Sequence, residues 1–155
     1  MRAQGVTPSG ILPPPRLDRR GRKVGIDVLD LSTGQTRPLA TYDAGGGETV
    51  GCYTFDPAAL RWAIARLKAA VDAGPALLVV DEIGPLELIH GGGFVNVLDP
   101  LADPQRVPHG LVIVREACVA TLEARLDRPD ARRFWIDRAN RDAMPAQIAE
   151  ALEKI

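Results

Sequence analysis

The sequence has little of several residue types that mark specialised classes of protein. Of its 155 residues two are cysteine, and aromatic residues make up 5%. Cys52 and Cys118 stand alone, without a CxxC pair or a Cys/His cluster, which argues against a disulfide framework and a zinc site. We interpret both as small buried hydrophobic residues. No apolar run approaches the roughly 18 residues of a membrane-spanning helix, and Met1 to Pro8 lack the apolar part of a signal peptide. We therefore expect a cytoplasmic protein with no membrane contact.

An excess of charge of one sign is also missing. Nineteen Lys and Arg residues oppose twenty Asp and Glu residues, for a net charge of -1. No overall field therefore attracts nucleic acid, and we do not expect a nucleic-acid partner. We interpret the basic run from Arg16 to Lys23 as a solvated hairpin tip rather than an RNA contact. Hydrophobic residues at 46% and charged residues at 25% are typical of a globular protein with one core.

Thirteen prolines and fifteen glycines divide the chain into short units. Residues 1–15 are rich in both types, so we expect a loop there rather than a paired strand. The helix with the clearest limits lies between Asp56, a natural N-cap followed by Pro57, and Gly74. Further helices are predicted at residues 94–101, 117–126 and 145–154, and strands at 23–31, 36–41, 52–55, 76–80, 111–114 and 133–136. Strands that alternate with helices in the second half favour an α/β fold with a parallel sheet.

The strongest chemical signal is Asp81-Glu82, which directly follows the apolar run Leu77 to Val80. A buried strand that ends in two acids places them at the carboxyl edge of a parallel sheet, where ligands bind in open α/β folds. In P-loop NTPases this is the Walker B arrangement, in which the Asp holds Mg²⁺ and the following Glu polarises the attacking water. An apolar run followed by two acids is also a common polar strand end, so both interpretations stay open at this point.

The partner of a Walker B motif is absent from the sequence. A Walker A loop needs the pattern G-x-x-x-x-G-K-[ST], so that backbone N–H groups, a Lys and a hydroxyl surround the phosphates. Gly5 and Gly10 have the glycine spacing, but Ile11 and Leu12 stand where Lys and Ser or Thr are required. The runs Gly45–Gly47 and Gly91–Gly93 also lack the Lys, and we interpret them as loops.

Several segments occur in an order that matches a known family. The block Val80 to Leu88 is similar to a "DEIGxxEL" motif nearly residue for residue, although Pro85 stands where a polar or basic residue is usual. It is accompanied by four further segments: Gly5–Thr7, the hairpin Arg22–Leu31, Gly51–Tyr53 and Asn140–Asp142. In this order the chain resembles the bacterial and archaeal P-loop nucleoside-triphosphatases, also called cancer-related nucleoside-triphosphatases. The family's first strand, P-loop and following helix have no counterpart in the sequence.

The resemblance implies a fold as well as an activity. The expected fold is a P-loop-NTPase-like α/β domain, with a parallel sheet flanked by helices and a β-hairpin insertion, in which the first strand and the P-loop helix are missing. Loss of a central strand would leave unpaired sheet edges. We expect one truncated domain over residues 1–155: a loop-like segment at 1–20, a hairpin and strand region at 22–55, and an α/β core with the Walker B motif at 56–155.

Carried over by position, the resemblance implies Asp81 as the Mg²⁺ ligand, through water, and Glu82 as the catalytic base. Arg115, at the end of the next strand, would sense the γ-phosphate, or be a surface arginine beside Glu116. Asn140 and Arg141 would lie near the nucleotide base, or form the turn that enters the last helix.

The implied activity is Mg²⁺-dependent hydrolysis of a nucleoside triphosphate, ATP or GTP, to the diphosphate and phosphate. Since the P-loop supplies most of the phosphate binding, we expect this chain to be crippled unless a P-loop is supplied from upstream or by another chain. The alternative is a non-catalytic binding or regulatory module derived from a P-loop NTPase.

Overall fold

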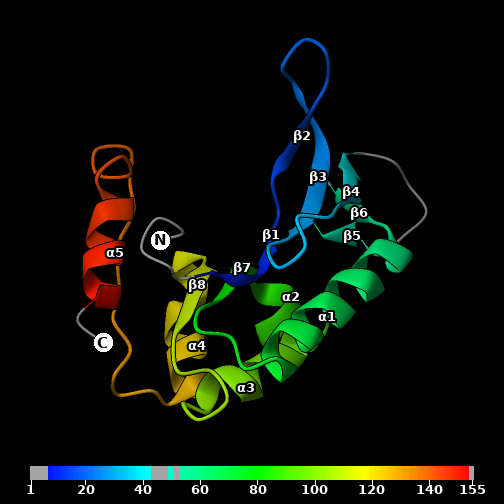
Figure 1. Cartoon of the computed structure of the whole chain (residues 1–155). Coiled ribbons are helices and arrows are strands. Elements are labelled where there is room, and N and C mark those ends of the chain that lie inside the picture. Colours follow the sequence, from blue (N-terminus) through cyan, green and yellow to red (C-terminus); the bar gives the residue numbers. More distant parts are fainter. Residues whose placement is uncertain (1–6, 43–48, 51–52, 154–155) are drawn as a thin grey trace.

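The computed structural model describes residues 7–42, 49–50 and 53–153 (Figure 1). Gly5, Val6, Gly45–Gly47, Gly51 and Cys52, which carry parts of the sequence motifs, lie outside these residues. Eight strands form one mixed sheet in the order β5-β6-β4-β3-β1-β7-β8, and β2 pairs with β3 beside this path. The strands are β1 (Ser9–Leu12), β2 (Pro15–Leu17), β3 (Lys23–Asp30), β4 (Thr36–Tyr42), β5 (Thr49–Val50), β6 (Tyr53–Phe55), β7 (Leu78–Ile83) and β8 (Gly110–Val114).

The sheet has a parallel part and an antiparallel part. Strand β7 runs parallel to β1 on one side and to β8 on the other, whereas β3, β4 and β6 follow β1 in antiparallel pairs. The predicted strands at 23–31, 36–41 and 111–114 are confirmed, and the strand predicted at 76–80 is displaced to Leu78–Ile83. Strands β2 and β3 form a hairpin that projects from the body (Figure 1), and Arg19, Arg20 and Arg22 are exposed at its tip, as expected.

The expectation of a loop over residues 1–15, and of a loop-like segment over 1–20, is wrong at Ser9–Leu12 and Pro15–Leu17, which form β1 and β2. Strand β1 lies inside the sheet between β3 and β7. Gly10 has φ +118°, and a Cβ at this position would lie 2.0 Å from the carbonyl oxygen of Val79. The glycine is therefore what allows β1 to approach β7, and Ile11 beside it is 1% exposed in the core. Pro15 begins β2, whose only recorded partner among the described residues is β3, a position that proline tolerates.

The helix predicted after Asp56 is confirmed as α1 (Pro57–Asp72). The Asp56 side chain accepts hydrogen bonds from the backbone N–H groups of Ala58 and Ala59, which satisfies the first turn. Helix α1 packs along β1, β3 and β4 and buries Ala63, Leu67 and Val71 against the sheet. Strand β1, the neighbour of the strand that carries the acid pair, is thereby covered on one face by this helix.

The remaining helices are short and lie in the second half of the chain. They are α2 (Pro85–Leu88), α3 (Leu98–Ala102), α4 (Val119–Leu126) and α5 (Met144–Glu153), with 3-10 turns at Val95–Val97 and Glu116–Cys118. The helices predicted near 94–101, 117–126 and 145–154 are confirmed with these limits. Cys118 is a free, buried thiol, as expected. In the described part of the chain, no helix has the length and apolarity needed to cross a bilayer.

The strand predicted at residues 133–136 is wrong, since this segment has no regular structure. The carbonyl oxygen of Trp135 accepts a hydrogen bond from Asn140 Nδ2 at 2.8 Å and is not part of a ladder. Trp135 and Ile136 are 53% and 57% exposed. The segment and α5 form an arm that stands beside the sheet in Figure 1. Within the described ranges the sheet therefore ends at β8, whose outer edge has no strand partner.

Candidate functional site

The two acids of the sequence motif lie on β7, between its parallel neighbours. Leu78, Val79 and Val80 are buried before them and Ile83 is buried after them, while Asp81 and Glu82 are half-buried. Asp81 is opposite Ile113 of β8, but the register shifts before Ile83 pairs with Val114. Such an irregularity re-aims a side chain, and it leaves Glu82 without a partner in the ladder. The acids thus occupy the carboxyl end of the strand, the position that the motif predicts.

The carboxyl group of Asp81 is in an electrostatically unfavourable position. Burial raises its pKa above the ordinary value, and the neighbouring charge of Glu82 raises the pKa further. Among the described residues, Asp81 has no side-chain hydrogen bond or ion pair that would offset these two effects. A cation beside Asp81 would offset both, because it favours the charged form of each carboxyl group.

Glu82 is paired with Arg115, the residue that follows β8. Arg115 Nε donates a hydrogen bond to Glu82 Oε1, and this bond, with the charge of Glu82, raises the pKa of Arg115. The side chains of Arg115 and Glu82 are 65% and 37% exposed. An ion pair this exposed contributes about 0–1 kcal/mol to stability, so it opens at little cost. The structure therefore brings together three of the predicted site residues at one rim of the sheet: Asp81, Glu82 and Arg115.

Among the described residues, no hydrogen bond or ion pair joins Asn140 or Arg141 to Asp81, Glu82 or Arg115. Asn140 Oδ1 accepts a hydrogen bond from the Asp137 N–H group, and its Nδ2 donates to the Trp135 carbonyl, so this side chain closes a turn. Arg141 is exposed and forms an ion pair with its neighbour Asp142. Both residues lie in the irregular stretch directly before α5. Of the two interpretations left open by the sequence, the geometry of Asn140 favours the helix-entry turn.

Glu87 is a further residue at this rim, to which sequence reasoning gave no role. It lies in α2, is 6% exposed, and its carboxylate accepts the N–H groups of Gly84 and Phe94 at 2.9 and 3.2 Å. Gly84 directly follows β7, so Glu87 binds the backbone next to the acid pair. The available signal was its spacing. Glu87 comes three residues after Gly84, which directly precedes the short helix α2, and a Glu at this spacing is typical of a capping box.

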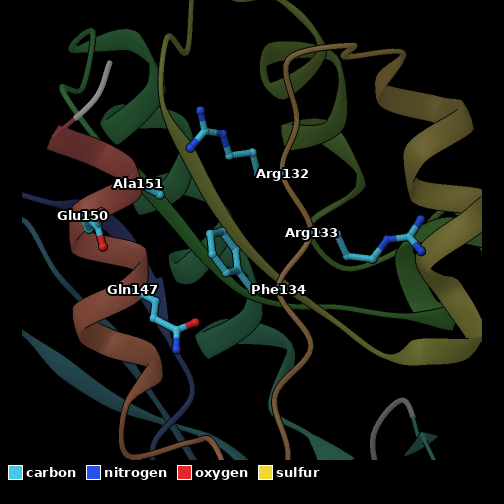
Figure 2. A pocket seen from close by; sticks show the side chains of 6 residues that line it. All are labelled: Arg132, Arg133, Phe134, Gln147, Glu150 and Ala151. Atoms are coloured by element: carbon cyan, nitrogen blue, oxygen red, sulfur yellow. The ribbon is translucent and has the colours of Figure 1, made fainter.

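A cavity of about 520 Å³ lies within the arm, between residues 132–134 and α5, and neither acid of the pair lines it (Figure 2). Figure 2 shows Arg132 and Phe134 directed toward α5, whereas Arg133 points the other way, toward α4, where it pairs with Glu123. Gln147, Glu150 and Ala151 line the helical side. No site residue predicted from the sequence lines this cavity, so the candidate site is the rim formed by β7 and β8.

Comparisons with known proteins agree with this geometry. A family model described as NTPase matches residues 1–149. The chain belongs to the NTPase family. This NTPase-family chain is 31% identical over 147 residues to the nucleoside-triphosphatase THEP1 of Methanopyrus kandleri, a match that covers 95% of this chain and 79% of that relative. It is 33% identical over 138 residues to the protein of the same name from Thermofilum pendens, covering 87% of this chain and 74% of the relative.

The fold of this NTPase-family chain also has a solved counterpart. The crystal structure of THEP1 from the hyperthermophile Aquifex aeolicus matches with a TM-score of 0.73 and 19% identity, over 98% of this chain and 87% of that chain. This likeness shows the fold, a mixed sheet flanked by helices, and so confirms the α/β architecture expected from the sequence.

Proposed function

We propose that this NTPase-family chain acts in the Mg²⁺-dependent hydrolysis of a nucleoside triphosphate to the diphosphate and phosphate. The observation that carries the proposal is the half-buried pair Asp81 and Glu82 at the carboxyl end of β7, with parallel strands on both sides. Clefts beyond the carboxyl ends of parallel strands are where α/β folds bind nucleotides.

The residues at this rim fit a magnesium ion. Carboxylate oxygens are the protein ligands that Mg²⁺ prefers, and Mg²⁺ takes one or two of them and fills its other positions with water and phosphate oxygens. Asp81 offers one carboxylate whose raised pKa, caused by burial and by Glu82, a cation would lower. We therefore assign Asp81 to the ion, through a water molecule. An ion held at Asp81 would supply positive charge against the negative charge that develops on the phosphates during transfer.

The ion pair between Glu82 and Arg115 supports a separate role for each residue in the reaction: Arg115 binds the γ-phosphate and Glu82 accepts a proton from water. In the structure Arg115 holds Glu82. The negative γ-phosphate competes for the guanidinium, and once Arg115 pairs with it, the carboxylate of Glu82 is free to accept a hydrogen bond from water. The water oxygen then attacks the γ-phosphorus, its proton passes to Glu82, and the β–γ bridging oxygen leaves with the electron pair on the diphosphate. Arg115 thus serves as the γ-phosphate sensor.

A phosphate-binding loop is the part that the sequence does not supply, and we propose that it is contributed by residues outside these 155 or by another chain. The outer edge of β8 offers a place for it, because no strand of the described part pairs there. A strand added parallel to β8 at the usual spacing of about 4.8 Å would end at the same rim as Arg115. Without this loop, we expect nucleotide binding and turnover to be poor.

The experiment joins a strand, a G-x-x-x-x-G-K-[ST] loop and a helix to the N-terminus of the chain, and measures Mg-ATP binding and phosphate release with and without this unit. We expect the extended chain to gain a ligand-dependent rise in melting temperature and measurable turnover. In the extended chain, Glu82→Gln should lower turnover by about a hundredfold or more and keep nucleotide binding, since a general base contributes about 10²–10⁴ in rate.

A matched control variant makes this test specific. Glu116→Gln changes an acid two residues after β8 that has no assigned role, and should leave turnover unchanged. Rapid turnover by the 155-residue chain alone would contradict the expectation that it hydrolyses nucleotide poorly without a P-loop. Full turnover by Glu82→Gln would contradict the assignment of Glu82 as the base. Binding without turnover in every extended form would favour the non-catalytic module instead.

We also infer a cytoplasmic, reducing setting, which the free thiol of Cys118 suits.

A further inference from the structure

Two carboxylates are deeply buried in the described part of the chain, and they are held in different ways. Asp30, 1% exposed, accepts hydrogen bonds from the Ser32 N–H group, the Thr33 hydroxyl and Arg66, which supplies a counter-charge. Glu87, 6% exposed, accepts backbone N–H groups from Gly84 and Phe94, and no ion pair within the described residues neutralises it. A buried charge held by backbone groups alone is expensive unless those groups are fixed in place.

The carboxylate of Glu87 joins two ends of one loop. Gly84 is the first residue after β7, and Phe94 is ten residues later with its side chain buried in the core. Gly93 closes over the carboxylate from one side, since a Cβ at Gly93 would lie 2.1 Å from Glu87 Oε1. The carboxylate of Glu87 thus links the two ends of the segment 84–94 through their backbone N–H groups, and it holds Gly84 in place next to the end of β7.

The position of this clamp connects it with the acid pair. Asp81 and Glu82 are separated from Gly84 by Ile83 alone, and the register with β8 shifts at this point of β7. A strand end with an irregular register has few ladder bonds to hold its direction, so the Gly84 N–H bond to Glu87 is the next constraint along the backbone. The charge of Glu87 also reaches Arg115 across the rim and contributes to the raised pKa of that arginine.

We propose that Glu87 is a positioning residue, whose buried carboxylate fixes the backbone after β7 so that Asp81 presents its oxygens to the metal ion. This inference rests on the proposed function of Asp81. The effect passes through the Gly84 and Phe94 N–H groups rather than through contact with the ion or the nucleotide. Loss of a group that orients a metal ligand typically weakens metal affinity about 10–100-fold. Glu87→Gln retains the shape of the side chain, but its amide can accept only one of the two N–H groups.

The test measures the binding of Mn²⁺, used as a paramagnetic probe for Mg²⁺, by the broadening of backbone amide signals of residues 80–83. We expect Glu87→Gln to weaken Mn²⁺ binding about tenfold and to speed hydrogen exchange at the Gly84 and Phe94 amides. Gly93→Ala displaces the same carboxylate without changing its charge, and should weaken binding in the same direction. Asp30→Asn is the matched control: it disturbs the other buried carboxylate and should lower the melting temperature with Mn²⁺ affinity within about twofold of the parent.

Each outcome bears on a separate claim. If the parent chain binds Mn²⁺ at residues 80–83 and Glu87→Gln binds it equally well, the positioning role is refuted and the proposed function stands. If Asp30→Asn weakens binding as much as Glu87→Gln, the effect is general destabilisation and the positioning role is again refuted. If Mn²⁺ does not broaden residues 80–83 in the parent chain, Asp81 is not a metal ligand and both proposals fail.

Discussion

Replacement of Gly10 by alanine tests how closely β1 must approach the strand that carries the acids. The added Cβ would lie 2.0 Å from the Val79 carbonyl oxygen and 2.9 Å from its carbon and nitrogen, so one strand must move by about 1 Å or more. Overpacking of this kind typically costs about 1–3 kcal/mol, and a side chain in a sparsely populated backbone region costs about 1–3 kcal/mol more. The expected loss is therefore about 2–6 kcal/mol, a large share of the roughly 5–15 kcal/mol of an ordinary domain.

The measurement is urea unfolding of the parent, Gly10→Ala and Gly34→Ala. Gly34 has φ +74° and no atom within 4 Å of the place that an added Cβ would take, so alanine there tests the backbone strain without the overlap. We expect Gly34→Ala to cost about 1 kcal/mol with an unchanged m-value. If Gly10→Ala cost no more than Gly34→Ala, the close contact of β1 with β7 would not stabilise the fold, and the reasoning would be refuted.

Two further predictions concern charge and capping. Asp81→Asn should stabilise the chain at about pH 7. Burial and the charge of Glu82 raise the folded-state pKa of Asp81 above 3.8, so the charged carboxylate destabilises the fold at neutral pH. This penalty decreases as the pH falls through the folded-state pKa toward 3.8. Melting curves at about pH 7 and about pH 3 check this, and a gain that persists undiminished in acid would contradict it. Asp56→Ala should cost about 1 kcal/mol, since Asp56 caps the N–H groups of Ala58 and Ala59, and Asp56→Ser should recover most of the loss in urea unfolding. Equal losses for the alanine and serine variants would show that the cap does not stabilise α1.

The elements that sequence reasoning located are those whose signals are local. Helix α1 begins at Asp56 and Pro57 because capping and the fixed φ of proline act within one turn of the chain. Strands β7 and β8 were located from short apolar runs; β7 is buried between two parallel neighbours, whereas β8 lies at the edge of the described sheet and its residues are half-buried or exposed. The position of Asp81 and Glu82 on the sheet followed directly from the β7 assignment.

The elements that it missed depend on partners far away in the chain. Gly10 and Pro15 indicate a loop by local rules, yet Gly10 is required by the backbone of Val79, about 70 residues later. Residues 133–136 have the Phe, Trp and Ile typical of a strand, but this segment does not pair with the open edge of β8, and Asn140 binds the Trp135 carbonyl instead. The ion pair of Glu82 with Arg115 depends on the register of β7 with β8, which the composition of the two strands does not encode.

The parallel pairing of β1 with β7 has a consequence for the order of folding. Ser9 lies opposite Leu78, so this ladder closes a loop of about 70 residues, whereas β3 and β4 are joined by a short turn. Contacts between distant residues form late, because the entropy of closing the loop is lost before the contact is gained. The antiparallel strands can therefore assemble while the ribosome is still adding residues. Strand β7, which carries the acids, can join them only after α1 has been synthesised. The candidate site is therefore expected to form near the end of the folding reaction.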